Sequence, residues 1–149
     1  MTASTGADER REVILSDGTS VWLNENSQLT YAETFTSDKR AVQLKGEGFF
    51  EVTHNPAAPF TIQTAAGLEV AVLGTSFNLL TRTTARVELQ VTTGLVAMRD
   101  VAQNQEQKVS AGNALGWNKA DRSFEKLATS TNIKAVSYTH LTLPTKRIV

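Results

Sequence analysis

The stretch LKGEGFFEVTHNPAAPFTI contains two glutamates and a histidine, the residue types here that are best suited to acid–base chemistry. Glu47 and Glu51 could work as a paired general acid and base, with His54 as a proton acceptor. In an extended strand both carboxylates share one face, but at about 3.3 Å per residue their α-carbons are roughly 13 Å apart. Glycosidase carboxylates lie roughly 5 to 9.5 Å apart. We therefore expect both glutamates to be solvated residues of a sheet surface.

His54 precedes Asn55 and Pro56, a turn sequence, so we place it in the loop that ends this strand. No G-x-S-x-G motif accompanies it, and the other histidine is His140. The absence of cysteine excludes thiolate metal sites, a cysteine nucleophile and disulfides. The sequence therefore predicts no catalytic residue, no metal site and no cofactor, and an enzyme is the least favoured class.

The glycines of this region do not form a phosphate-binding loop. Gly46, Gly48 and Gly74 lack the G-x-G-x-x-G spacing, and no helix follows them. Within strands, glycine indicates a bulge, a tight bend or the close approach of another backbone. Nucleic acid is not an expected partner either, because 15 basic residues balance 15 acidic ones and no basic run is present.

The elements that position these residues are predicted to be strands. Short apolar segments rich in Val, Ile, Thr and Phe alternate with turn signals, of which Asp17-Gly18 is the strongest. No segment keeps a 3.6-residue apolar period over three turns. We predict an all-β single domain of about a dozen short, mostly antiparallel strands, arranged as a sandwich, barrel or short solenoid, with little or no helix. The candidate strands are 13–15, 21–23, 28–31, 41–44, 48–52, 60–63, 68–73, 76–80, 86–91, 95–98, 107–109, 114–117 and 124–127.

Four segments are expected along the chain. Residues 1–11 are small, polar and charged, which predicts a flexible lead-in. The β domain is placed at 12–128, followed by a linker at 129–135. The tail 136–149 differs in composition, and its first six residues, VSYTHL, match a translated frame of a transposase-type sequencing adapter. We interpret 136–149 as an adapter-derived artefact outside the natural domain.

Three aromatic residues are candidates for contact with a partner: Trp22, Phe49 and Trp117. Trp22 alternates with Val21 and Leu23, and we place Trp117 likewise out of phase with its aliphatic neighbour. Phe49 falls on the polar face of its strand, opposite in direction to Phe50. Each tryptophan either covers the edge of the core or is exposed to a partner. Exposed strand edges are a second route to a partner, since unpaired backbone accepts an added strand.

Three ordered motifs resemble those of the FecR family. The first is DGTSVWLN, the second LKGEGFFEV with Pro59-Phe60 after it, and the third VLGTSFN, while SAGNALGW is a weaker match to the family's closing turn. The resemblance covers about residues 10 to 128. It assigns structural motif positions to Asp17, Gly18, Gly46, Glu47, Phe49, Phe50, Gly74, Thr75, Phe77 and Asn78.

This resemblance implies a regulator. FecR-like proteins are bacterial inner-membrane anti-sigma factors or sigma regulators, and the matched domain lies in the periplasm. It implies, as partners, the signalling domain of a TonB-dependent outer-membrane receptor and an extracytoplasmic-function sigma factor. The family's sigma-binding cytoplasmic segment and its single membrane helix are not in this sequence. The rival interpretation is a carbohydrate- or surface-binding β module, which needs exposed aromatic residues lining a groove.

Overall fold

The computed structural model describes residues 1–127, and every regular element in that range is a strand. The strands are β1 (Thr2–Ser4), β2 (Arg11–Ile14), β3 (Ser20–Leu23), β4 (Gln28–Tyr31), β5 (Arg40–Glu51), β6 (Phe60–Thr64), β7 (Leu68–Val72), β8 (Ser76–Thr81), β9 (Arg86–Thr93), β10 (Leu95–Asp100), β11 (Gln105–Ser110), β12 (Ala114–Asn118) and β13 (Ser123–Leu127). The all-β prediction is confirmed.

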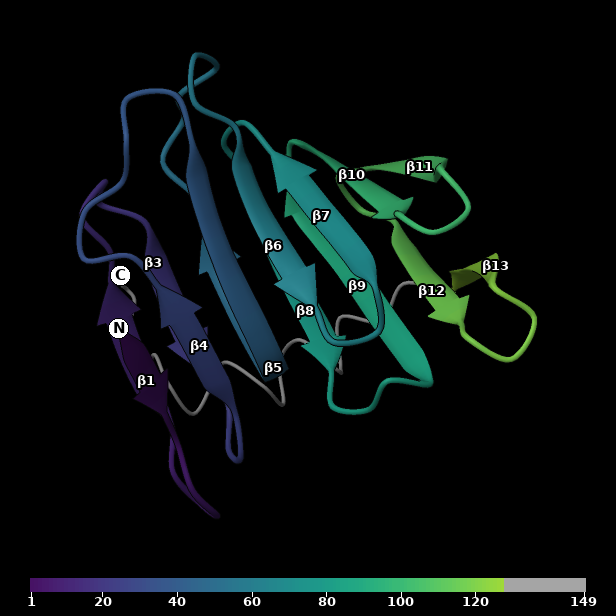
Figure 1. Ribbon diagram of the computed structural model, residues 1–149, viewed down its shortest axis with the longest axis horizontal. Helices are drawn as coiled ribbons and strands as arrows, with labels where there is room; N and C mark the ends of the chain where they lie inside the picture. The colour runs from purple at the N-terminus through teal and green to yellow at the C-terminus, as the bar shows by residue number, and fades with distance from the viewer. Residues whose placement is uncertain (128–149) are drawn as a thin grey trace.

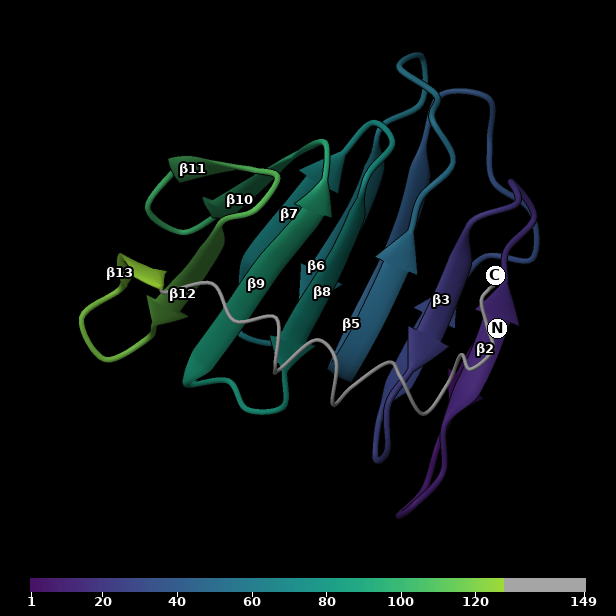
Figure 2. The same cartoon turned by 180° about the vertical axis from the view of Figure 1, so that it is seen from behind.

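The strands form two layers that share β5 (Figures 1 and 2). The first sheet has the order β1-β4-β5-β6-β7-β10-β11. The second sheet has the order β2-β3-β5-β8-β9-β12-β13. Every pairing is antiparallel except β5 with β6. After β5 the chain adds two strands to one sheet and then two to the other, so both layers grow in the same direction.

The core lies between the layers, and strict alternation along the strands builds it. In β6 and β7 every second residue is buried, as expected for strands with one solvated face. Phe50 of the second sheet stacks on Phe77, with ring centroids 5.1 Å apart, and meets Phe60 of the first sheet edge-on at 6.2 Å. These buried rings join the layers near the C-terminal end of β5.

β5 passes from one sheet to the other, and Gly46 is the residue at which it does so. Residues 40–45 pair with β4 and β6, whereas residues 46–51 pair with β3 and β8. Gly46 has φ +107°, and a Cβ there would lie 2.7 Å from Ser27 Cα. The sequence prediction of a bend and close approach at Gly46 is therefore confirmed, but the separate strands 41–44 and 48–52 are a single strand.

The N-terminal residues also differ from expectation. Residues 1–11 were predicted as a flexible lead-in, yet β1 pairs with β4 and Ala3 is buried. The sequence does not predict this strand, because it is only three residues long, lies in a polar segment and buries a single alanine. The predicted linker 129–135 and artefact tail 136–149 lie outside the described residues. Nowhere in residues 1–127 is there a helix with the length and hydropathy needed to cross a membrane.

Candidate functional site

Arg40 is the centre of a buried polar cluster that includes the Asp17-Gly18 turn. Its Nη1 donates to Asp17 Oδ2 at 2.9 Å and to the carbonyl oxygen of Thr53 at 2.7 Å. Further donations reach the carbonyl oxygens of Ala58, Asn55 and Leu73. The side chain is 2% exposed. One arginine therefore fixes the β2–β3 turn, the β5–β6 loop and the end of β7 to one another.

Glu47 is the centre of a second cluster, in which residues from all three sequence motifs meet. Its Oε1 accepts a hydrogen bond from Asn24 Nδ2 at 2.8 Å, and its Oε2 accepts one from Asn78 Nδ2 at 2.9 Å. Glu47 is buried, so the expectation that it is a solvated surface residue is wrong, while Glu51 is exposed as predicted. Two amides occupy the Glu47 carboxylate oxygens, and this cluster holds β3, β5 and β8 in register.

His54 lies in the loop after β5, as predicted, and is exposed. A Cβ at Gly74 would overlap the His54 backbone and lie 2.7 Å from its Cβ, which explains why this position is glycine. Thr75 directly precedes β8 and is buried, and Phe77 on β8 is fully buried. No group of three His, Cys, Asp or Glu side chains within residues 1–127 could hold a metal ion.

The three aromatic candidates have different environments. Trp22 and Phe49 are direct cross-strand neighbours, half-buried, with ring centroids 6.0 Å apart. Trp117 is 0% exposed and belongs to the core, so its candidacy as a partner contact is wrong. Trp117 and Leu115 are two residues apart on β12 and therefore point the same way, inward. The structure brings Trp22 and Phe49 together and separates Trp117 from them.

A further ion pair, between half-buried Arg122 and buried Asp100, joins the two sheets at the end opposite to β1. Arg122 Nη2 donates to Asp100 Oδ1 at 2.7 Å, and the guanidinium lies 5.5 Å from the Trp117 ring centroid. Burial alone raises the pKa of Asp100, but hydrogen bonds from Arg122 and the Gln103 backbone, with the Arg122 charge, outweigh it and leave that pKa below its ordinary value. Near the same end, hydrogen bonds to Glu88 and Glu125 raise the pKa of Arg86.

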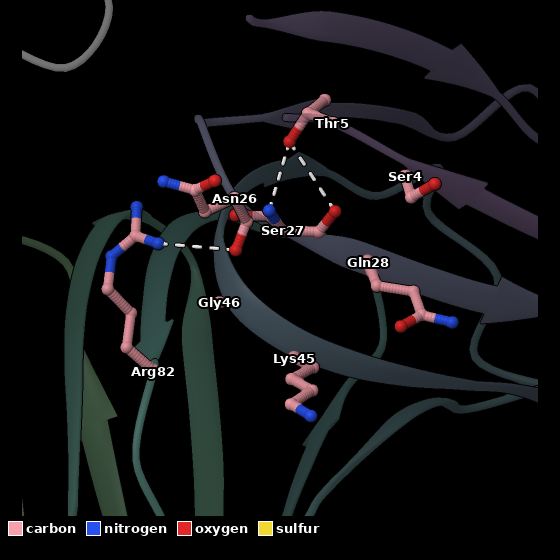
Figure 3. Close-up of a pocket in the computed structure, with 8 residues that line it drawn as sticks. All are labelled: Ser4, Thr5, Asn26, Ser27, Gln28, Lys45, Gly46 and Arg82. Atoms are coloured by element: carbon pink, nitrogen blue, oxygen red, sulfur yellow. Dashed lines mark hydrogen bonds between the residues drawn. The ribbon is translucent and has the colours of Figure 1, made fainter. Parts of the chain in front are cut away.

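A polar cleft of about 450 Å³ lies where β5 changes sheets, with Gly46 at its floor (Figure 3). Arg82 points across it and donates to the carbonyl oxygen of Asn26 at 3.4 Å, while Lys45 points away. Thr5 bonds both the N–H and the carbonyl oxygen of Ser27. These side chains supply hydrogen-bond partners to the backbone of the β3–β4 turn, so we assign the residues of this cleft a structural role.

The outer face of the first sheet carries a row of small side chains that we call the alanine trough: Ala41, Thr61, Ala71 and Ala97. These residues are direct neighbours in register across β5, β6, β7 and β10. All four are half-buried, because their side chains are too short to project from the sheet. A row across four strands extends roughly 15 Å, given a strand spacing of about 4.8 Å.

The two walls of the alanine trough have different chemistry. On one side Leu73 and Leu95 are 44% and 51% exposed, and they flank a cleft of about 450 Å³ that reaches Pro59, His54 and Lys108. On the other side the polar groups pair with one another. Gln63 donates to Glu69 at 2.6 Å, and Arg99 lies 3.7 Å from the same carboxylate. An exposed apolar wall above a smooth floor is suited to holding apolar side chains of another protein.

Sequence reasoning missed Arg40, Asp100, Arg122 and the alanine trough. No local motif marks Arg40, because its five partners lie between 13 and 33 residues away in the chain. The trough depends on register, which joins alanines from strands that are not adjacent in sequence. Alanines that recur on the outward positions of predicted strands were the available signal.

Comparisons with known proteins agree with this architecture. A family model described as "FecR protein" matches residues 1–97. Two crystal structures of a candidate anti-sigma factor from Parabacteroides distasonis are similar to the chain, each with a TM-score of 0.83 and 28% sequence identity. The similarity covers 91% of this chain, but the chain spans only 64% and 63% of those two chains. No curated protein matches the chain.

Proposed function

Because the chain belongs to the FecR protein family, we propose that it is the sensor and relay domain of an anti-sigma factor. In this proposal the domain lies in the periplasm and binds the signalling domain of a TonB-dependent outer-membrane receptor. A cytoplasmic segment outside this sequence holds an extracytoplasmic-function sigma factor. The similarity to a candidate anti-sigma factor supports the regulatory part of the proposal.

The observation that carries a binding role is the alanine trough with its exposed leucine wall. Of the carboxylates in the three sequence motifs, Glu47 is bonded to two amides and Asp17 to Arg40. By contrast, Leu73 and Leu95 expose apolar surface beside a smooth floor. We propose that the receptor domain docks its apolar side chains here. A signal can pass through the domain only if the partner binds two conformations with different affinity.

A carbohydrate-binding role has less support. Sugar-binding grooves rely on aromatic side chains, and no Phe, Tyr or Trp lines the leucine-walled cleft or the polar cleft at Gly46. Trp117 is buried in the core. Trp22 packs against Phe49, and both residues belong to the second sheet, away from the alanine trough.

Binding to the signalling domains of cognate receptors, measured by titration calorimetry, tests the proposal. Ala71→Arg fills the trough and is expected to weaken binding at least tenfold, because apolar contacts are replaced by a long charged side chain. Gln43→Arg adds the same side chain to an exposed position on the same face and should leave binding within about twofold. Equal effects of the two variants, or no binding by the unmodified chain, contradict the proposal.

A further inference from the structure

The outermost strand of the first sheet, β11, has an unpaired edge. β11 pairs with β10 on one side only, and it lies at the margin of the molecule in both views (Figures 1 and 2). Its sequence is QEQKVS, in which Val109 is buried and the other residues are exposed. An exposed edge of six residues offers backbone N–H and C=O groups to another strand.

The alternation of β11 places its charges on one face. Val109 is buried against the core, so Gln105 and Gln107 share its face, and Glu106 and Lys108 point to the opposite, outer face. Lys108 is opposite Ala97 on β10, and Glu106 is opposite Arg99. In the described part of the chain neither Glu106 nor Lys108 forms an ion pair. The edge therefore carries one acid and one base, two residues apart.

These charges are complementary to a second copy of the same strand. In an antiparallel pair, residues directly opposite each other point to the same face of the sheet. Because side chains alternate between the two faces along β11, two copies related by a twofold axis can pair only in registers in which one residue lies opposite the same residue of the second copy. Centred on Gln107, the pairing places Glu106 opposite Lys108 of the second copy, and Lys108 opposite Glu106, which gives two cross-strand ion pairs. Centred on Glu106 or Lys108, it places like charges directly opposite each other, which is destabilising.

We propose that the protein forms a twofold dimer through antiparallel pairing of β11 with β11, centred on Gln107. The two first sheets become one continuous sheet, and the alanine trough of each copy stays open on its outer face. Because the contact consists of one six-residue strand from each copy, we expect a weak dimer that forms at high local concentration. Its ion pairs make it weaker at high salt. This inference does not depend on the proposed receptor partner.

Sedimentation equilibrium over a concentration series tests the dimer through its charges. Glu106→Lys and Lys108→Glu each replace two attractive pairs by two repulsive ones and should raise the dimer dissociation constant at least about tenfold. The double variant E106K/K108E restores opposite charges and should recover most of the affinity. Ala71→Arg, which blocks the trough, should leave dimerisation unchanged. A chain that stays monomeric at every concentration, or a double variant no better than the single ones, overturns the proposal.

Single cysteines report the register, because the natural sequence has none. Gln107→Cys faces its own copy at a distance that a disulfide can bridge, and mild oxidation should yield a covalent dimer. Gln105→Cys keeps both charges, lies opposite Val109 of the second copy in this register and should react no faster than Ala102→Cys, an exposed control in the β10–β11 turn. Faster cross-linking at residue 105 than at 107 overturns the proposed register, and equal rates at residues 102, 105 and 107 overturn the dimer.

Discussion

At the scale of single residues, Arg40 connects segments that are far apart in the sequence. It is almost fully buried, and its guanidinium connects three separated segments through Asp17 and four backbone carbonyl oxygens. Removing the guanidinium leaves a partly buried carboxylate and those carbonyls without their donor. We expect Arg40→Met to lower the free energy of unfolding by about 3–5 kcal/mol, since breaking a buried ion pair is strongly destabilising.

Urea unfolding checks this prediction. Methionine keeps an apolar stem over Phe60, whose ring centroid is 5.5 Å from the guanidinium carbon, so the loss reports mainly on the polar contacts. Arg10→Met, at an exposed position, is the control and should change stability by less than about 0.5 kcal/mol. A cost at Arg40 below about 1 kcal/mol would show that the cluster is not important for stability.

Residue roles were predictable only where they depend on local pattern. The inward direction of Phe50 and the loop position of His54 follow from alternation and turn chemistry, and both are confirmed. Glu47 was placed on the solvated surface because carboxylates are seldom buried. Its burial depends on amides from two distant motifs, Asn24 and Asn78, and a single strand pattern cannot show that they converge.

At the scale of elements, the bend in β5 depends on Gly46. This glycine combines a positive φ with the contact of Ser27, so an alanine there is both strained and overpacked. Gly67 has a similar positive φ of +86°, but nothing lies within 4 Å of its Cβ position. We expect Gly46→Ala to cost at least about 2 kcal/mol more than Gly67→Ala, because the second variant bears only the backbone strain. Thermal and urea unfolding of both variants would measure the difference, and equal costs would contradict the packing argument.

The strands themselves were largely predictable, because β-branched and aromatic residues alternate between clear turn signals. The strand predictions are wrong for an unusually short strand, β1, and for an unusually long one, β5. Glycine ordinarily ends a strand, so Gly46 and Gly48 suggested two segments. Here Gly46 bends one strand and lets its two halves serve different sheets.

At the scale of the whole molecule, the Asp100–Arg122 pair makes stability depend on pH. Asp100 ends β10 of the first sheet, and Arg122 lies in the turn between β12 and β13 of the second. The pKa of Asp100 is lower in the folded protein than in the unfolded chain, so the pair stabilises the fold above about pH 4 and this contribution is lost as the pH falls further.

Asp100→Asn should therefore be less stable than the natural protein near pH 7, and the difference should shrink as the pH falls from about 5 to about 2. Urea unfolding of both proteins across that range would measure it. A difference that stays constant with pH would mean that Asp100 contributes through packing and not through its charge.

The layered arrangement was predictable as a class but not as a topology. Regular short strands indicated a sandwich, barrel or solenoid, and the molecule combines two packed sheets with a regular alternation of strand pairs between them. Sheet order depends on which strand edges meet. That order is set by buried groups such as Arg40, Phe50 and Trp117, whose partners are distant in the sequence.

The shared strand β5 also has a consequence for the order in which the chain folds. Its neighbours β3 and β4 precede it in the sequence, while β6 and β8 follow it. A nascent chain that has reached Glu51 therefore already contains one complete flank of both sheets, and the opposite edge of β5 is ready for the next strands. Since domains fold from the N-terminus during synthesis, β5 can act as a common template that aligns the two sheets before most of either has been translated.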